Sequence, residues 1–161
     1  MATYRALVFV LVLICCGVAL PVEAAADRFT DNGDGTITDH QLNLMWAKTD
    51  NQGDIDWHQA RKWVAFTFPL TLQTSYDNWR LPTLKELQSL VAEPGYETDC
   101  GLDAHIIPLI RLTCGWVWTA ESDATAPTAR VFNFDNIYHY TVRMAHRRGY
   151  RALAVRSIVD K

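Results

Sequence analysis

"NWRLPTLKELQSLVAEPG" (residues 78–95) is the strongest local structural signal in the chain. Thr83 and Glu86 have the T-x-x-E spacing of a capping box, in which each side chain accepts a hydrogen bond from the other residue's backbone N–H. The apolar residues that follow share one helical face: Leu84, Leu87, Leu90 and Val91. Proline cannot continue a helix, so the segment predicts a helix that begins after Thr83 and ends at "EPG", residues 93–95.

The flanking segments predict one more helix and several strands. Residues 56–66 place Trp57, Ala60 and Val64 at the spacing of an amphipathic helix, capped by Asp54 or Asp56. Before this helix, alternating β-type runs and turn residues predict a hairpin or meander. Four later runs are β-branched or aromatic and predict strands: "WVWTAES", "ARVFNFDN", "YHYTVRM" and "YRALAVRSI". This order predicts an α+β domain with two helices and an antiparallel β-sheet.

"TDNGDGTITD" (residues 30–39) has the letters of a calcium-binding loop. When Asp34 and Gly35 take positions 5 and 6 of an EF-hand loop, Thr30 falls at position 1 and Gln41 at position 12. The loop therefore lacks the first Asp and the bidentate Glu. Asn and Gly residues tolerate positive φ in tight turns, so we predict a hairpin turn here, with no metal and no cofactor.

Residues 1–26 have the pattern of a secretory signal peptide. Arg5 precedes the apolar run "ALVFVLVLICCGVAL", and small residues allow cleavage after Ala24 or Ala26. An uncleaved anchor is the alternative, although the run is shorter than the roughly 20 apolar residues of a membrane span. We therefore expect a secreted, periplasmic or cell-surface protein, with one domain in residues 27–161 and no stable membrane span after cleavage.

The expected export bears on how the cysteines are interpreted. Cleavage would remove Cys15 and Cys16, so that only Cys100 and Cys114 remain. Two cysteines in an exported domain predict one disulfide, here closing a loop of about 15 residues. The alternative is a catalytic thiol pair, which the spacing alone does not exclude.

Charge divides along the chain. Residues 27–129 hold 7 basic and 15 acidic residues, a net charge of −8, whereas residues 130–156 hold 6 arginines and one aspartate, a net charge of +5. In the second part, "RMAHRRGYR" is predicted to be a hairpin connection with six candidate ligand-binding residues: Arg143, His146, Arg147, Arg148, Tyr150 and Arg151. Guanidinium groups match sulfate and phosphate geometry, which favours a polyanion site. The alternative is a solvated loop whose arginines offset the acidic part of the chain.

The six tryptophans allow either a sugar-stacking surface or core packing. We expect core positions for Trp57, Trp79 and at least one of Trp116 and Trp118, while the helical phase of Trp63 is undecided. The histidines lack the spacing of a zinc site, and no common hydrolase or nucleotide-binding motif occurs. The sequence therefore predicts no catalytic residues and no metal ligands.

The order of the motifs resembles the Lcl C-terminal domain family, named for a bacterial collagen-like adhesin. The motifs that carry the resemblance are "DNGDGTITD…LMWAK", "DWHQARKW", "NWRLPTLKELQSLV", "CGWVWTAES" and "ALAVR". They extend over residues 28–156. The resemblance implies a C-type-lectin-like fold related to the formylglycine-generating enzyme domain. The chain has no collagen-like stalk, so the trimeric presentation of the namesake is not implied.

Three functions known for this fold can be compared with the residues present. The "EPG" at Glu93 and "WTA" at Trp118 lack the Asn or Asp oxygens of the C-type-lectin calcium site. The reactive cysteine pair of the formylglycine-generating enzyme lies near its C-terminus, whereas Cys100 and Cys114 lie mid-chain, so a thiol-dependent oxidase activity is only a remote alternative. Binding of sulfated polysaccharides, as in the namesake adhesin, agrees with the arginine-rich segment.

The sequence therefore predicts a non-enzymatic binding or adhesion module at the bacterial cell envelope. Its expected partner is a sulfated or other anionic polysaccharide. The alternative is a structural or accessory subunit of a surface assembly that binds protein partners. No nucleic-acid partner is predicted, and the sequence leaves the oligomeric state open.

Overall fold

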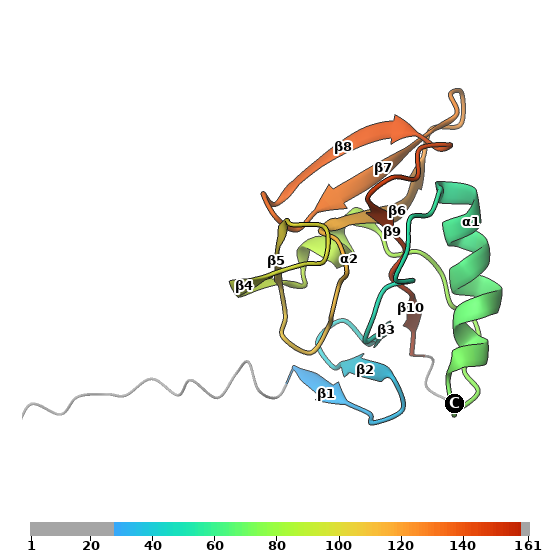
Figure 1. The fold of residues 1–161 in the computed structure, drawn as a ribbon. Helices are drawn as coiled ribbons and strands as arrows, with labels where there is room; N and C mark the ends of the chain where they lie inside the picture. The colour runs from blue at the N-terminus through green and yellow to red at the C-terminus, as the bar shows by residue number, and fades with distance from the viewer. Residues whose placement is uncertain (1–27, 159–161) are drawn as a thin grey trace, which may run out of the picture.

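A computed structural model describes residues 28–158 and shows an α+β fold (Figure 1). The predicted signal peptide and its cleavage site lie outside the described residues. The first sheet has the strand order β1-β2-β3-β10, and all its neighbours are antiparallel. Its strands are β1 (Phe29–Asp31), β2 (Thr36–Asp39), β3 (Leu44–Ala47) and β10 (Val155–Ser157). Strands from the two ends of the described chain therefore pair directly.

The turn between β1 and β2 confirms the predicted hairpin in "TDNGDGTITD". Gly33 and Gly35 have φ of +76° and +92°, which L side chains rarely adopt. Asp34 Oδ1 accepts the Thr36 N–H at 3.1 Å, and its Oδ2 accepts the Tyr76 hydroxyl at 3.0 Å. Both carboxylate oxygens of Asp34 are therefore engaged in holding the turn.

The first predicted helix begins as expected and continues further. Asp56 is its cap and accepts the Gln59 N–H at 2.9 Å. Helix α1 (Trp57–Lys62) runs into a π-helical turn, η2 (Trp63–Thr67), and a 3-10 turn, η3 (Phe68–Thr71). The predicted apolar face is buried, since Trp57, Ala60 and Val64 are almost inaccessible to solvent.

Helix α2 (Leu84–Gln88) has the predicted capping box, but the expected helix end at Pro94 is wrong. Strand β4 (Val91–Glu97) contains this proline. It pairs with β5 (Asp103–Ile106) to form the second sheet, which has two strands. Leu90 is fully buried and its carbonyl accepts the Ile107 N–H, so the chain leaves the helix here. Leucine spacing alone did not separate the last helical turn from the start of a strand.

The third sheet contains the other predicted strands, in the order β8-β7-β6-β9. They are β6 (Trp116–Ser122), β7 (Thr128–Asn133), β8 (Tyr138–Arg143) and β9 (Tyr150–Arg151). The pairing of β6 with β9 is parallel, so the sheet is not purely antiparallel. The predicted hairpin in "RMAHRRGYR" is also wrong, because β8 and β9 lie at opposite edges of the sheet and the segment between them crosses its end. The run "YRALAVRSI" is divided between β9 and β10, which belong to different sheets.

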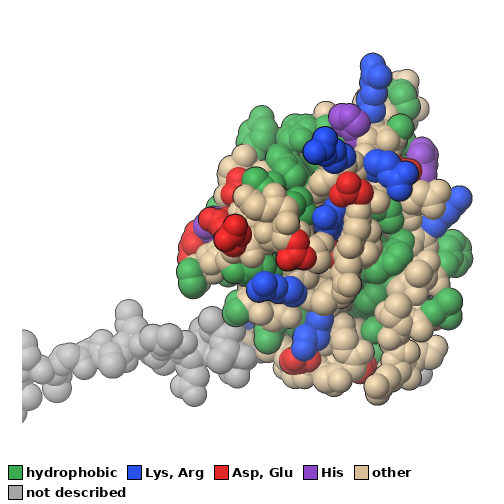
Figure 2. All heavy atoms as spheres, viewed as in Figure 1, with side chains coloured by type: hydrophobic (Ala, Val, Ile, Leu, Met, Phe, Trp, Pro, Cys, Tyr) green, Lys and Arg blue, Asp and Glu red, His purple; other side chains and the backbone are tan. Residues whose placement is uncertain are grey.

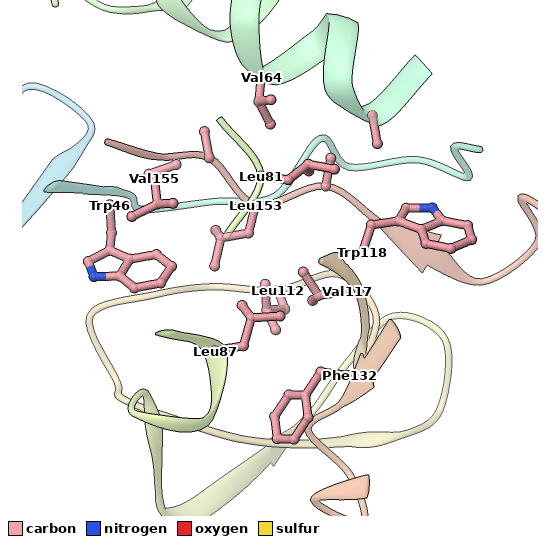
Figure 3. Close-up of a cluster of buried hydrophobic side chains, with 14 of the residues drawn as sticks. Trp46, Val64, Leu81, Leu87, Leu112, Val117, Trp118, Phe132, Leu153 and Val155 are labelled. Carbon is pink, nitrogen blue, oxygen red and sulfur yellow. The ribbon is translucent and has the colours of Figure 1, made fainter. Parts of the chain in front are cut away.

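The core draws side chains from all of these layers (Figure 3). Trp46 and Val155 come from the first sheet, Val64 from the helical segment and Leu87 from α2. The third sheet adds Val117, Trp118 and Phe132. Tryptophan N–H groups fasten residues 55–57 to β6, since Trp118 donates to the Ile55 carbonyl and Trp57 to the Thr119 carbonyl, both at 2.9 Å. This packing fixes the start of α1 beside the third sheet.

Candidate ligand-binding groove

A groove of about 480 Å³ opens where β9 meets the start of β6. One side is formed by the connection that ends in Arg148 and Gly149. Asp54 and the Trp116 ring also line the groove. We call it the β6–β9 groove. It includes two of the six residues that the sequence marked as candidates, Arg148 and Arg151.

The opposite wall is the Cys100–Cys114 disulfide, with Leu102 beside it. The two Cα atoms are 5.3 Å apart, and the predicted disulfide is confirmed. Cys114 lies two residues before the start of β6. The bond therefore fixes the loop between β4 and β5 against the sheet that contains β6. This wall supplies an apolar surface next to the charged side of the groove.

Arg151 is buried beneath the groove and is engaged with protein groups. Its Nη1 donates to Asp54 Oδ1 at 2.8 Å, and its Nε donates to Thr113 Oγ1 at 2.7 Å. Asp50, which is completely buried, lies 3.9 Å from Nε. Arg151 therefore connects three separate segments of the chain. The sequence interpretation had expected its guanidinium to face solvent instead.

The two carboxylates near Arg151 differ in their acidity. The hydrogen bond from Arg151 lowers the pKa of Asp54, and the Gly149 N–H and the charge of Arg148 act in the same direction. Burial raises the pKa of Asp50, although hydrogen bonds from Thr113 and Gln52 oppose this effect. Asp54 is thus an ionised, half-exposed residue of the groove. Asp50 does not line the groove and is buried behind it, near Arg151 and Thr113.

Tyr150 is likewise an internal residue. Its hydroxyl lies 3.1 Å from the Tyr140 hydroxyl, and its ring meets the Trp118 ring edge-on at 4.8 Å. Burial raises the pKa of the Tyr150 phenol, and the hydrogen bond with Tyr140 adds to the effect. Of the six predicted ligand-binding residues, Tyr150 and Arg151 are therefore buried, although Arg151 lines the groove together with Arg148.

The remaining four side chains are exposed: Arg143, His146, Arg147 and Arg148. No ion pair within residues 28–158 involves these arginines. Their backbone is held in place, because Met144 is buried between them and its N–H donates to the Pro127 carbonyl at 2.9 Å. Figure 2 shows basic and histidine side chains gathered over the β8–β9 connection and the start of α1, with acidic side chains concentrated towards β4 and β5.

Trp116 is the aromatic residue of the groove. It is partly exposed, and the Tyr140 ring packs edge-on against it at a centroid distance of 4.9 Å. Trp57, Trp79 and Trp118 are buried, which confirms their predicted core positions, and Trp63 is partly exposed. Sequence reasoning missed Trp116 and Asp54 as groove residues, because strand alternation does not show which tryptophan lies at the end of the sheet.

The sequence model of the Lcl C-terminal domain family matches residues 35–156 of the chain. The chain belongs to the Lcl C-terminal domain family. No curated protein matched the chain. The matched region encloses every residue of the β6–β9 groove, so the groove lies within the Lcl C-terminal domain itself.

A second cavity of this Lcl C-terminal domain, about 370 Å³, lies between α1 and β6. Of its two arginines, Arg80 makes a paired hydrogen bond to Glu86 at 2.7 and 2.8 Å, so its charge is compensated. Arg61 remains, with its guanidinium 4.8 Å from the centre of the Trp57 ring. Each cavity thus has one arginine outside the ion pairs of the described residues. The β6–β9 groove is the stronger candidate for an anionic ligand, because its arginine of this kind, Arg148, follows the exposed His146 and Arg147 in the chain.

Residues 28–158 contain His, Cys, Asp and Glu side chains, which are common protein ligands of metal ions. In this part of the chain, no group of three or more His, Cys, Asp or Glu side chains is placed to hold a metal ion. Nor is any helix of the described residues long and apolar enough to cross a membrane. The groove itself is lined by two guanidinium groups, one carboxylate and one tryptophan ring.

Proposed function

We propose that this Lcl C-terminal domain is an exported, non-enzymatic binding or adhesion module that recognises sulfated or other anionic polysaccharides. The observation that carries the proposal is the position of Arg148, an exposed arginine outside every ion pair of the described residues, beside the partly exposed Trp116 in one groove. A guanidinium group can make paired hydrogen bonds to a sulfate or carboxylate. An aromatic ring supplies an apolar face for the C–H groups of a sugar.

Exposed residues near Arg148 lengthen the surface that a polymeric ligand can contact. Arg143 is the last residue of β8, and His146 and Arg147 lie on the connection that leads to Arg148. Asp54 adds a negative charge, but Arg151 compensates it at 2.8 Å. A polymer with repeated anionic groups would contact several of these cations at once, which favours a polysaccharide over a single small anion.

The proposal extends to the fold and the location of the protein. The family to which the chain belongs and its two helices packed with β-sheets support a C-type-lectin-like fold. Export to the periplasm, the cell surface or the medium is supported by the sequence pattern of residues 1–26, and the Cys100–Cys114 disulfide is compatible with it.

A glycan screen of the purified domain tests the proposal. We expect retention of heparin and other sulfated polysaccharides but not of their desulfated forms, with and without calcium. Trp116→Ala should weaken binding by about tenfold, the effect of losing one aromatic contact of roughly 1 kcal/mol or more. Lys85→Ala, an exposed cation on α2, is the matched control and should bind like the wild type. Equal binding of sulfated and desulfated forms would contradict the proposal.

The second candidate is a structural or accessory subunit that binds a protein partner. It is favoured by Ile137 and Tyr138, which are 48% and 60% exposed at the turn between β7 and β8. Adjacent exposed apolar side chains are common in protein interfaces. A screen in which no glycan is retained would favour this candidate over polysaccharide binding.

A further inference from the structure

The helical segment of residues 57–71 has an unusual outer side. It stands at the edge of the molecule, and its inner side buries Val64 and Phe68 against the core (Figure 1). On the outer side, Phe66 and Leu70 are 72% and 85% exposed. They are the two most exposed large hydrophobic residues among those that the structure describes. Packing in the core therefore does not explain why residues 66 and 70 are apolar.

Cations accompany these two residues, and anions do not. His58, Arg61 and Lys62 are exposed on the same segment, and residues 57–76 contain no Asp or Glu. This contrasts with residues 27–129 as a whole, whose net charge is −8 on 7 basic and 15 acidic residues. One shallow hollow of about 350 Å³ is lined by His58, Arg61, Lys62 and Phe66, so these four residues share a surface. We call His58, Arg61, Lys62, Phe66 and Leu70 the outer face of residues 57–71.

From this combination we infer that the outer face of residues 57–71 docks on an anionic phospholipid surface. Helices that lie in a membrane interface pair Lys and Arg with protruding Phe and Leu side chains. Phe66 and Leu70 would enter the boundary between headgroups and acyl chains, while Arg61 and Lys62 contact lipid phosphates. Each cation near an anionic membrane adds to the attraction.

A lipid surface fits this face better than a protein partner does. Stable protein interfaces bury on the order of 1,000 Å² or more and have an extended apolar centre. Here only two apolar side chains protrude, next to cations that a lipid headgroup layer would neutralise. The inference is independent of the proposed polysaccharide site, because none of its residues lines the β6–β9 groove.

Vesicle co-sedimentation of the chain beginning at Asp27 tests the inference. We expect binding to vesicles of phosphatidylglycerol and phosphatidylcholine, and little binding to phosphatidylcholine alone. Phe66→Ser/Leu70→Ser should raise the lipid concentration needed for half-maximal binding by about tenfold or more, because apolar burial in the interface is lost. Arg61→Glu/Lys62→Glu should abolish the preference for phosphatidylglycerol.

Matched controls use residues away from this face. Ile137→Ser removes an exposed apolar side chain, and Lys85→Glu reverses an exposed charge. Both should bind vesicles like the wild type, and all variants should keep the wild-type Tm and heparin retention. Absence of binding to the anionic vesicles would overturn the inference, as would unchanged binding of Phe66→Ser/Leu70→Ser. A dimer that this double variant converts to a monomer would identify the face as a self-interface instead, and would also overturn it.

Discussion

Arg151 lies between two carboxylates that respond differently to pH. The half-exposed Asp54 accepts its Nη1 at 2.8 Å, and the fully buried Asp50 lies 3.9 Å from its Nε. Thr113 bridges the two sides, because its hydroxyl donates to Asp50 and accepts from Arg151. The groove is thus supported by a charged network in which Arg151 and Asp50 are buried and only Asp54 reaches solvent.

Asp50→Asn tests how this network responds to pH. Burial raises the pKa of Asp50 in the folded chain, so the folded chain holds this proton more tightly than the unfolded chain does. Its contribution to stability therefore falls as pH rises from about 4, the unfolded value, through the raised pKa. Asp50→Asn removes this component. As pH rises from 4 to 7, the Tm of Asp50→Asn should therefore increase relative to the Tm of the wild type.

Scanning calorimetry at several pH values measures this difference. Because the comparison concerns the slope with pH, a uniform loss of stability in Asp50→Asn does not affect it. Asp77→Asn, at a carboxylate that is 85% exposed, is the control and should follow the wild type. Parallel pH profiles for Asp50→Asn and the wild type would show that Asp50 does not titrate in this way.

At the scale of elements, one covalent bond links the loop between β4 and β5 to the residues just before β6. Cys100 is exposed and Cys114 is buried, and the disulfide between them holds the loop against the start of β6. Leu102 lines the β6–β9 groove and lies inside this loop. The bond therefore contributes both to stability and to the shape of the groove.

Cys100→Ser/Cys114→Ser should lower the free energy of unfolding by about 3 kcal/mol, the loop-entropy effect of a disulfide that closes roughly 15 residues. Urea unfolding measures the change, and the wild type with a mild reductant should show the same loss. The reduced protein should also bind polysaccharide more weakly, because one wall of the groove is released. An unchanged free energy of unfolding would contradict this role.

For the whole molecule, the predictable features were those set by neighbours in sequence. The capping box of Thr83 and Glu86 spans three residues, and the first hairpin turn is set by Gly33 and Gly35. Both were predicted and are present. The disulfide was predicted from cysteine number and expected compartment, without geometry.

The features that sequence did not predict depend on distant partners. Arg151 bonds to Asp54, which lies 97 residues earlier, and β9 pairs with β6 across most of the C-terminal third of the chain. Neither pairing leaves a local pattern, so Arg151 was placed with the exposed arginines. Charge composition located the basic segment correctly, but only tertiary structure separates its exposed cations from its buried one.

The most direct test of the central claim is the salt dependence of heparin-fragment binding by the wild type and by Arg143→Ala/Arg147→Ala/Arg148→Ala. These three exposed arginines are expected to supply the ionic contacts, each worth about tenfold in affinity. We expect a much weaker Kd and a flatter dependence on salt for the triple variant, with an unchanged Tm. An unchanged Kd and an unchanged salt dependence would contradict polyanion recognition by this surface.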